Sequence, residues 1–276
     1  VMDMVSGRGI ARPSRSDQTA GQGILIPIAY LYQTATDEVK DKIGTFAKSQ
    51  ILSAMEYNPE YLYNMSIADV AAFKSLLNDD SIPSKEDNLY HKVFGAMDKV
   101  VHHAKDFTLG ISMYSNRVGS FEYGNGENLK GYHISDGALF LYNGDQAQFA
   151  DDYWPTVDHM RLTGITTDHS EGTISDSWET HVSTKNRVGG SSVLSKYGST
   201  GMDFEAENST LTGKKSWFSF DDEVVALGAG IRSASGREVE TIIENRKIKD
   251  DGSNQLLVDG KTAGSEIGLS EIKENA

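Results

Sequence analysis

The stretch "DFTLGISMY", residues 106 to 114, marks a change in the hydrophobic pattern of the chain. Its apolar residues, Phe107, Leu109, Ile111 and Met113, alternate with small or polar residues. This alternation predicts a half-buried β-strand, because successive side chains of a strand point to opposite faces. Short β-type segments such as "ALFLY" and "KSWFSF" follow, separated by clusters of Gly, Asn, Asp and Ser. Residues 106–276 are therefore predicted to form an antiparallel β-sandwich domain.

The residues before this stretch follow a helical period instead. In "DEVKDKIGTFAKSQILSA", residues 37 to 54, apolar residues form one stripe along a helix. "SIADVAAFKSLL" begins with Ser66 and Asp69 three positions apart, which is an N-capping pattern. "HKVFGAMDKVVHHA", residues 91 to 104, shows a further stripe that we also expect to be helical. Residues 1–105 are therefore predicted to form a helical domain.

Composition excludes several classes of function. The chain has 276 residues, a formal net charge of −14 and no cysteine. Disulfides, thiolate nucleophiles and cysteine-based zinc sites are thus excluded, and so acidic a protein is not expected to bind nucleic acid. No apolar run is long enough to span a membrane. The first residues, "VMDMVSGRG", lack a signal-peptide pattern and an initiating Met, so we expect a truncated or processed chain.

Three arginines and no acid occupy "GRGIARPSR", residues 7 to 15. Arg8 and Arg12 are four positions apart, so a helical or turn-like segment would project both to one side. Guanidinium groups bind carboxylates and sulfates bidentately, which makes the pair a candidate clamp for an acidic sugar. The alternative is a solvated basic turn that pairs with the protein's own acidic residues.

The glycine-rich stretch that spans 116–137 holds a second candidate site, with Glu122 and Asn125 among its polar residues. Such a loop could present a carboxylate and an amide at a cleft between the two domains; it could equally be a turn-rich connection. The aromatic residues of 149–154 are either carbohydrate contacts or core anchors. The seven histidines form no metal-binding pattern, and no nucleophile elbow or phosphate-binding loop is present.

Taken together, these stretches resemble polysaccharide lyase family 8, which includes hyaluronate, chondroitin AC and xanthan lyases. The resemblance runs in order along the chain to about residue 250. It rests on "MDMVSGRGIAR" at 2–12, "MDKVVHH" at 97–103, "GISMYSNRVGSFEYGNGENLKGY" at 110–132, "DGALFLYNGDQAQFADDYWPTVDHMRLTGITTD" at 136–168, "NRVGG" at 186–190, "KSWFSFDDEVVALGAGI" at 215–231 and "VETIIENR" at 239–246.

The resemblance implies an α+β multidomain fold, in which an incomplete (α/α) toroid precedes an antiparallel β-sandwich, the super-sandwich. It also implies a secreted enzyme, without a cofactor, that cleaves uronic-acid-containing polysaccharides of the hyaluronan or chondroitin type by β-elimination. The chain would then be a fragment that is inactive alone, because the family's catalytic Asn, His and Tyr are expected upstream of "GRGIAR". Its partners would be the acidic polysaccharide and the remainder of its own full-length chain.

Four residues match the family's functional positions. Arg8 and Arg12 fall on the Gly-Arg-x-x-x-Arg pattern and are the expected catalytic residues, while Glu122 and Asn125 fall on a Glu-x-x-Asn pattern and are expected to bind substrate. Ser6 departs from the family, where a further arginine is common, so the basic patch is expected to be weaker here. The alternatives are a xanthan lyase, a non-catalytic glycan-binding fragment or, with weaker support, a glycoside hydrolase with two carboxylates.

Overall fold

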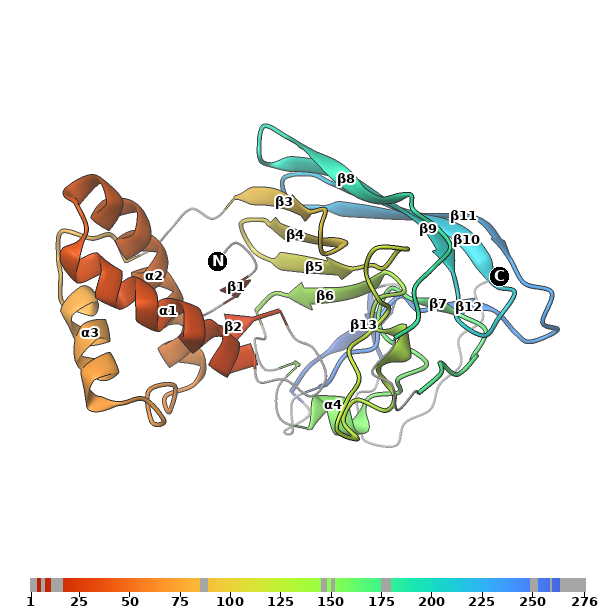
Figure 1. The fold of residues 1–276 in the computed structure, drawn as a ribbon, viewed down its shortest axis with the longest axis horizontal. Coiled ribbons are helices and arrows are strands. Elements are labelled where there is room, and N and C mark those ends of the chain that lie inside the picture. Colours follow the sequence, from red (N-terminus) through yellow and green to blue (C-terminus); the bar gives the residue numbers. More distant parts are fainter. Residues whose placement is uncertain are drawn as a thin grey trace.

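Three helices stand beside two antiparallel sheets, and a short N-terminal hairpin lies between the two parts (Figure 1). The structure is a computed structural model. It describes residues 4–5, 8–10, 17–84, 89–144, 148–149, 152–174, 180–248, 253–258 and 260–263.

The helical part consists of α1 (Asp17–Thr34), α2 (Asp37–Tyr57) and α3 (Ile67–Leu77). The predicted N-cap is confirmed, because the hydroxyl of Ser66 accepts a hydrogen bond from the backbone N–H of Asp69. One face of each helix contributes to a shared core. That core consists of Leu25, Ala29, Tyr32, Ala47, Ile51, Ala54, Tyr61, Ala72, Phe73, Leu76 and Ile82.

Two four-stranded antiparallel sheets form the β part of the fold, together with the short elements described below. In sheet order, the first contains β3 (Tyr90–Phe94), β4 (Lys99–His103), β5 (Thr108–Ser112) and β6 (Ala138–Tyr142). The second has the order β11 (Val224–Arg232), β10 (Thr212–Ser219), β9 (Tyr197–Glu205) and β8 (Val188–Val193). The strand expected around residues 106–114 is confirmed as β5.

Residues 91–104 do not form the expected helix: they belong to the hairpin of β3 and β4, in which Val93 pairs with Val100. The turn between the strands places Asp98 at a φ of 48°, a left-handed conformation outside any right-handed helix. The helices thus end at Leu77 and the sheet begins at Tyr90. We propose that the two parts of the chain join between these residues rather than at 106.

The first sheet separates two cores. Leu139 and Leu141 of β6 face the second sheet, where Val100, Ile111, Phe204 and Trp217 are buried together. The alternate residues of β6, Ala138, Phe140 and Tyr142, face a separate core under long loops. Alternate side chains of residues 138–142 therefore pack into two different cores, so both faces of β6 are covered.

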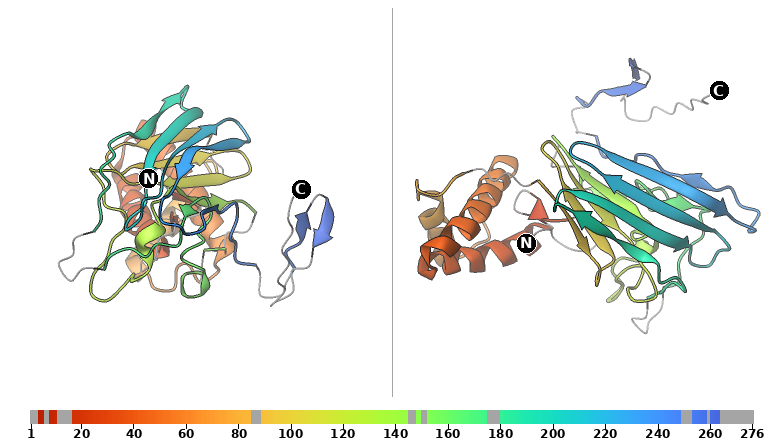
Figure 2. Two further views of the ribbon diagram at one scale, coloured as in Figure 1. Left: turned by 90° about the vertical axis from the view of Figure 1, so that its right-hand side faces the viewer. Right: turned by 90° about the horizontal axis from the view of Figure 1, so that it is seen from above.

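Short elements complete the fold. They are β1 (Met4–Val5) with β2 (Arg8–Gly9), the 3-10 turn η1 (Gly131–His133), α4 (Tyr153–Thr156), β7 (Thr166–Thr167) with β12 (Glu240–Thr241), and β13 (Leu256–Val258) with β14 (Lys261–Ala263). The hairpin β13–β14 stands apart from both sheets in the two views of Figure 2.

Candidate functional site

Arg8 lies in β2, where it pairs with Val5 of β1. Its side chain is 2% exposed, and its guanidinium carbon lies 4.1 Å from the centre of the Tyr57 ring, at the end of α2. A cation over an aromatic face is attracted by the negative face of the π-system. Arg8 is therefore held against the helical part rather than presented to solvent.

The next described residue, Ile10, contacts the sheets. Its Cγ2 lies 3.2 Å from the position that a Cβ on Gly110 of β5 would occupy, and it packs against the core under β6. The N-terminal segment thus touches the helices through Arg8 and the sandwich through Ile10. Arg12, the second predicted arginine, lies outside the described residues.

Glu122 and Asn125 lie together on one loop, and both are exposed. Asn125 has a φ of 53°, a left-handed conformation that asparagine tolerates, in a turn closed by a hydrogen bond from the N–H of Glu127 to the carbonyl of Gly124. The side-chain amide of Asn128 donates to the carbonyl of Glu122 at 2.5 Å. The loop is therefore both a locally determined turn and a surface that presents a carboxylate and an amide.

Arg117 serves the fold. Its guanidinium lies 2.7 Å from the buried carboxylate of Asp98 and donates to the carbonyls of Asn186 and Val188. These contacts tie the turn of the β3–β4 hairpin to the entry of β8. Arg117 therefore has a structural role.

The aromatic residues of 149–154 are core anchors, as one of the two sequence interpretations expects. The ring of Phe149 lies 5.5 Å from that of Phe140 and 5.1 Å from that of Tyr153. Tyr153 is buried, and burial raises the pKa of its hydroxyl above the ordinary value. The side chains that could have faced a sugar are instead packed under β6.

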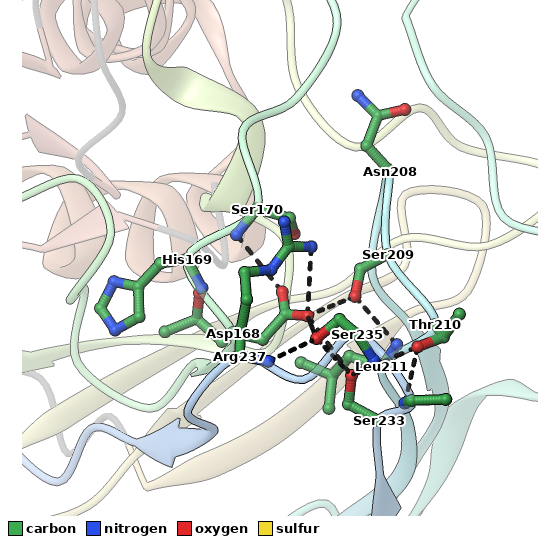
Figure 3. A network of polar contacts seen from close by, with 12 residues as sticks. Asp168, His169, Ser170, Asn208, Ser209, Thr210, Leu211, Ser233, Ser235 and Arg237 are labelled. Carbon is green, nitrogen blue, oxygen red and sulfur yellow. Dashed lines mark hydrogen bonds and ion pairs between the residues drawn. The ribbon is translucent and has the colours of Figure 1, made fainter.

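A buried polar network around Asp168 was not predicted (Figure 3). Its carboxylate accepts hydrogen bonds from Ser209 at 2.5 Å and Ser235 at 2.9 Å, and Arg237 lies 3.3 Å away. Burial alone would raise the pKa of Asp168, but the hydrogen bonds outweigh it and hold the pKa well below its usual range. The network joins the β9–β10 turn to the segment after β11 and is structural.

A second buried polar group contains His133 and Asp136. The Nδ1 of His133 lies 2.7 Å from a carboxylate oxygen of Asp136, and its Nε2 lies 2.9 Å from the carbonyl of Ser170. Burial lowers the pKa of His133, but the hydrogen bond and charge of Asp136 dominate and raise it. Both ring nitrogens are engaged, which leaves neither of them for a metal ion.

The part of the chain that the structure describes contains no group of three His, Asp or Glu side chains placed to hold a metal. In the same residues, no helix is long and apolar enough to cross a bilayer.

Comparisons with known proteins give a consistent result. The family model "Polysaccharide lyase family 8, super-sandwich domain" matches residues 89–275. The chain is 37% identical to the xanthan lyase of Bacillus sp. (strain GL1) in an alignment of 272 residues that covers 98% of the chain. It is 38% identical over 250 residues to the hyaluronate lyase of Staphylococcus aureus (strain NCTC 8325 / PS 47), which covers 90%.

Among solved structures, the chondroitin AC lyase of Streptomyces coelicolor A3 in complex with chondroitin sulphate matches with a TM-score of 0.82 and 30% identity. That match covers 94% of this chain and 37% of the other. The chain likewise spans only 28% and 31% of the length of the two curated relatives. The similarity therefore extends over both the helices and the sheets, but over a minor part of each relative.

Proposed function

Because this chain belongs to polysaccharide lyase family 8, we propose that it is part of a secreted enzyme that cleaves uronic-acid-containing polysaccharides of the hyaluronan and chondroitin type by β-elimination. The helices α1 to α3 followed by two four-stranded sheets fit the end of the family's incomplete toroid followed by the start of its super-sandwich. A polymer too large to enter a cell has to be degraded outside it, which is the argument for secretion.

The observation that carries the proposal is that the sequence similarity to known lyases continues from the helices, which end at Leu77, into the sheets, which begin at Tyr90. The relative named for xanthan aligns over 98% of the chain, which includes Arg8 as well as the loop of Glu122 and Asn125, and the relative named for hyaluronan aligns over 90%. A domain shared only for structural reasons would account for the sheets alone. Similarity on both sides favours a shared reaction at the place where the two parts meet.

The reaction is an elimination at a uronic acid. A base removes the proton on C5, the bond from C4 to the glycosidic oxygen breaks, and a C4=C5 double bond forms. The leaving oxygen takes a proton from a general acid. Neutralising the carboxylate on C5 makes the C5 proton more acidic, so hydrogen-bond donors and cations near that carboxylate accelerate the reaction.

Arg8 and Arg12 are proposed to supply positive charge on the side of the acidic sugar and leaving group. The burial of Arg8 is compatible with this role, because a cation shielded from water acts more strongly on developing charge. Glu122 and Asn125, exposed on one loop, are proposed to hold the sugar from the sandwich side.

The general base is proposed to be the His or Tyr of the family and the general acid its Tyr, while the amide of its Asn neutralises the uronate carboxylate. All three are proposed to be contributed by the longer protein outside this chain. The chain alone is therefore expected to be inactive. The double bond conjugated to the carboxylate absorbs ultraviolet light, which gives a direct assay.

To test the proposal, the longest natural reading frame that contains this sequence is expressed and incubated with hyaluronan, chondroitin and xanthan. The expected result is a rise in ultraviolet absorbance with at least one polymer, and a roughly 100-fold lower kcat/KM for Arg8→Ala and Arg12→Ala. Arg232→Ala, at an exposed position of β11, is the matched control.

New reducing ends without absorbance would identify a hydrolase and overturn the lyase proposal. If the protein is retained on an immobilised polysaccharide but cleaves none of the polymers, it is a glycan-binding protein and the lyase proposal is overturned. Preference among the three polymers would decide between the hyaluronan or chondroitin class and xanthan.

A further inference from the structure

We propose that Tyr57 positions the guanidinium of Arg8 for the elimination reaction. The inference rests on the proposed function, to which it adds a positioning residue that the sequence pattern does not contain. Tyr57 is the last residue of α2, far from Arg8 along the chain, and the fold brings its ring under the Arg8 guanidinium.

The contact between the two side chains is close. The guanidinium carbon of Arg8 lies 4.1 Å from the ring centre, well within the roughly 6 Å over which a cation and an aromatic face attract each other. A planar guanidinium that stacks on a ring also loses rotational freedom, so the contact limits where its N–H groups point. The aromatic face thus restricts the orientation of Arg8 as well as its location.

Tyr57 itself is firmly placed. The next residue, Asn58, ends α2 by donating its backbone N–H to Ala54, and its side-chain amide donates to Gln18 of α1 at 3.0 Å. One turn later, the side-chain amide of Gln22 donates to the carbonyl of the buried Tyr61 at 2.5 Å. These contacts join the end of α2 to α1, so the ring is carried by two packed helices.

The backbone of Arg8 depends on this support. It lies in a two-residue strand whose only pairing in the described residues is with β1. Two residues later, Ile10 is fixed against β5 of the first sheet. Arg8 is thus held on one side by the sandwich, through Ile10, and on the other by the helices, through Tyr57.

The expected consequence is on kcat rather than on KM. Charge stabilisation depends on where the cation is when the carboxylate and leaving oxygen gain charge, and a displacement of about 1 Å can cost up to 100-fold. Substrate binding, shared among many contacts along a polymer, changes less.

The first experiment uses the longer protein with Tyr57→Leu and Tyr57→Phe. We expect Leu to lower kcat about tenfold or more with KM within about twofold, whereas Phe, which keeps the aromatic face, retains most activity. Tyr63→Leu is the control, because Tyr63 lies in the same helical part with 76% of its side chain exposed. Combining Tyr57→Leu with Arg8→Ala should add no further loss, since the tyrosine acts through the arginine.

A second experiment keeps the shape of the side chain and changes only its electrostatics. Phenylalanine with an increasing number of ring fluorines is incorporated at position 57, which weakens the negative face of the ring stepwise. We expect kcat to fall steadily along the series while the melting temperature stays constant. A purely structural tyrosine would give a flat series, and that result would overturn the inference even if Tyr57→Leu does not fold.

The two proposals fail differently. Loss of activity in Arg8→Ala together with a flat fluorination series overturns the role of Tyr57 alone. Full activity in Arg8→Ala overturns the proposed role of Arg8 and the inference with it. No lyase activity in the longer protein overturns the proposed function and therefore both.

Discussion

Lys215 of β10 is a cation enclosed between the two sheets. Its ammonium group donates to the carbonyl of Asp136 at 2.8 Å and to that of Gly164 at 2.5 Å, and it lies 5.8 Å from the ring centres of Phe204 and Trp217. Burial lowers the pKa of Lys215 from 10.5 to about 8, against a smaller opposing effect of the Asp136 charge. The charged form of Lys215 is therefore less well stabilised inside the protein than it would be in water.

Lys215 should give the stability of the protein a dependence on alkaline pH. Between pH 8 and 10.5 the unfolded chain keeps a proton that the folded chain has released, so the free energy of unfolding rises with pH. The full shift corresponds to about 3 kcal/mol. In urea unfolding at pH 7.5 and pH 10, Lys215→Met should remove most of this rise, although it leaves two carbonyls unpaired. An unchanged difference between the two pH values would contradict the prediction.

Residues of the candidate site were predictable to different degrees. Arg8 could be named because Gly-Arg-x-x-x-Arg is a local pattern, and Glu122 with Asn125 because they share one loop. Tyr57 could not, since its contact with Arg8 exists only after β2 has packed against the end of α2. Local patterns identify the candidate residue, whereas its contact partner depends on the tertiary fold.

At the scale of elements, the β3–β4 hairpin shows where periodicity is ambiguous. The apolar residues Val93, Phe94, Met97, Val100 and Val101 fit one face of a helix. In the structure the valines and Phe94 lie instead in two short strands, and Met97 lies in the four-residue turn between them. β-Branched valines favour strands, and the pairing with β5 and with the β8–β9 turn decides the outcome. By contrast, α2 and α3 were predictable because their stripes are longer or capped.

The same hairpin buries a pair of histidines across its strands. His91 of β3 lies opposite His102 of β4, with ring centres 5.6 Å apart, and both are almost fully buried. The ring of His91 also lies so close to Gly198 of β9 that no side chain fits there. Burial, helped by the neighbouring His102, lowers the pKa of His91 to about 4. Burial also lowers the pKa of His102, against smaller opposing effects of a hydrogen bond with the backbone of Phe220 and of the Asp221 charge.

This histidine pair should make the contact between the sheets sensitive to acid. Between pH 6.5 and 4, His91 is protonated in the unfolded chain but neutral in the folded one. The free energy of unfolding therefore falls as the pH falls through this range. We expect a loss of about 1 to 2 kcal/mol from pH 7 to pH 5 in urea unfolding, and a smaller loss in His91→Leu. Equal losses in the two proteins would show that His91 does not carry the effect.

The whole molecule is organised around its two four-stranded sheets, with the helices α1 to α3 at one end of them (Figures 1 and 2). β11 is an open edge of the second sheet: in the described residues it pairs only with β10, and the other side of its backbone is unpaired. Its sequence "VVALGAGIR" has a single charge, at Arg232. Natural edge strands usually carry charges or bulges that prevent pairing with another chain. β11 has one such irregularity, where its register with β10 shifts between Ala229 and Arg232, and is regular from Val224 to Ala229.

The open edge predicts self-association of the chain. On the outer face of the second sheet, Phe218 and Val225 are paired across the strands, and Leu227 beside them is 56% exposed. Contact between two such edges would bury these side chains and pair the free backbone groups of β11. Sedimentation equilibrium of the 276-residue chain should show association that weakens about tenfold or more in Leu227→Lys. Leu194→Lys, at an exposed turn away from this edge, should change nothing, and a monomer at every concentration would refute the prediction.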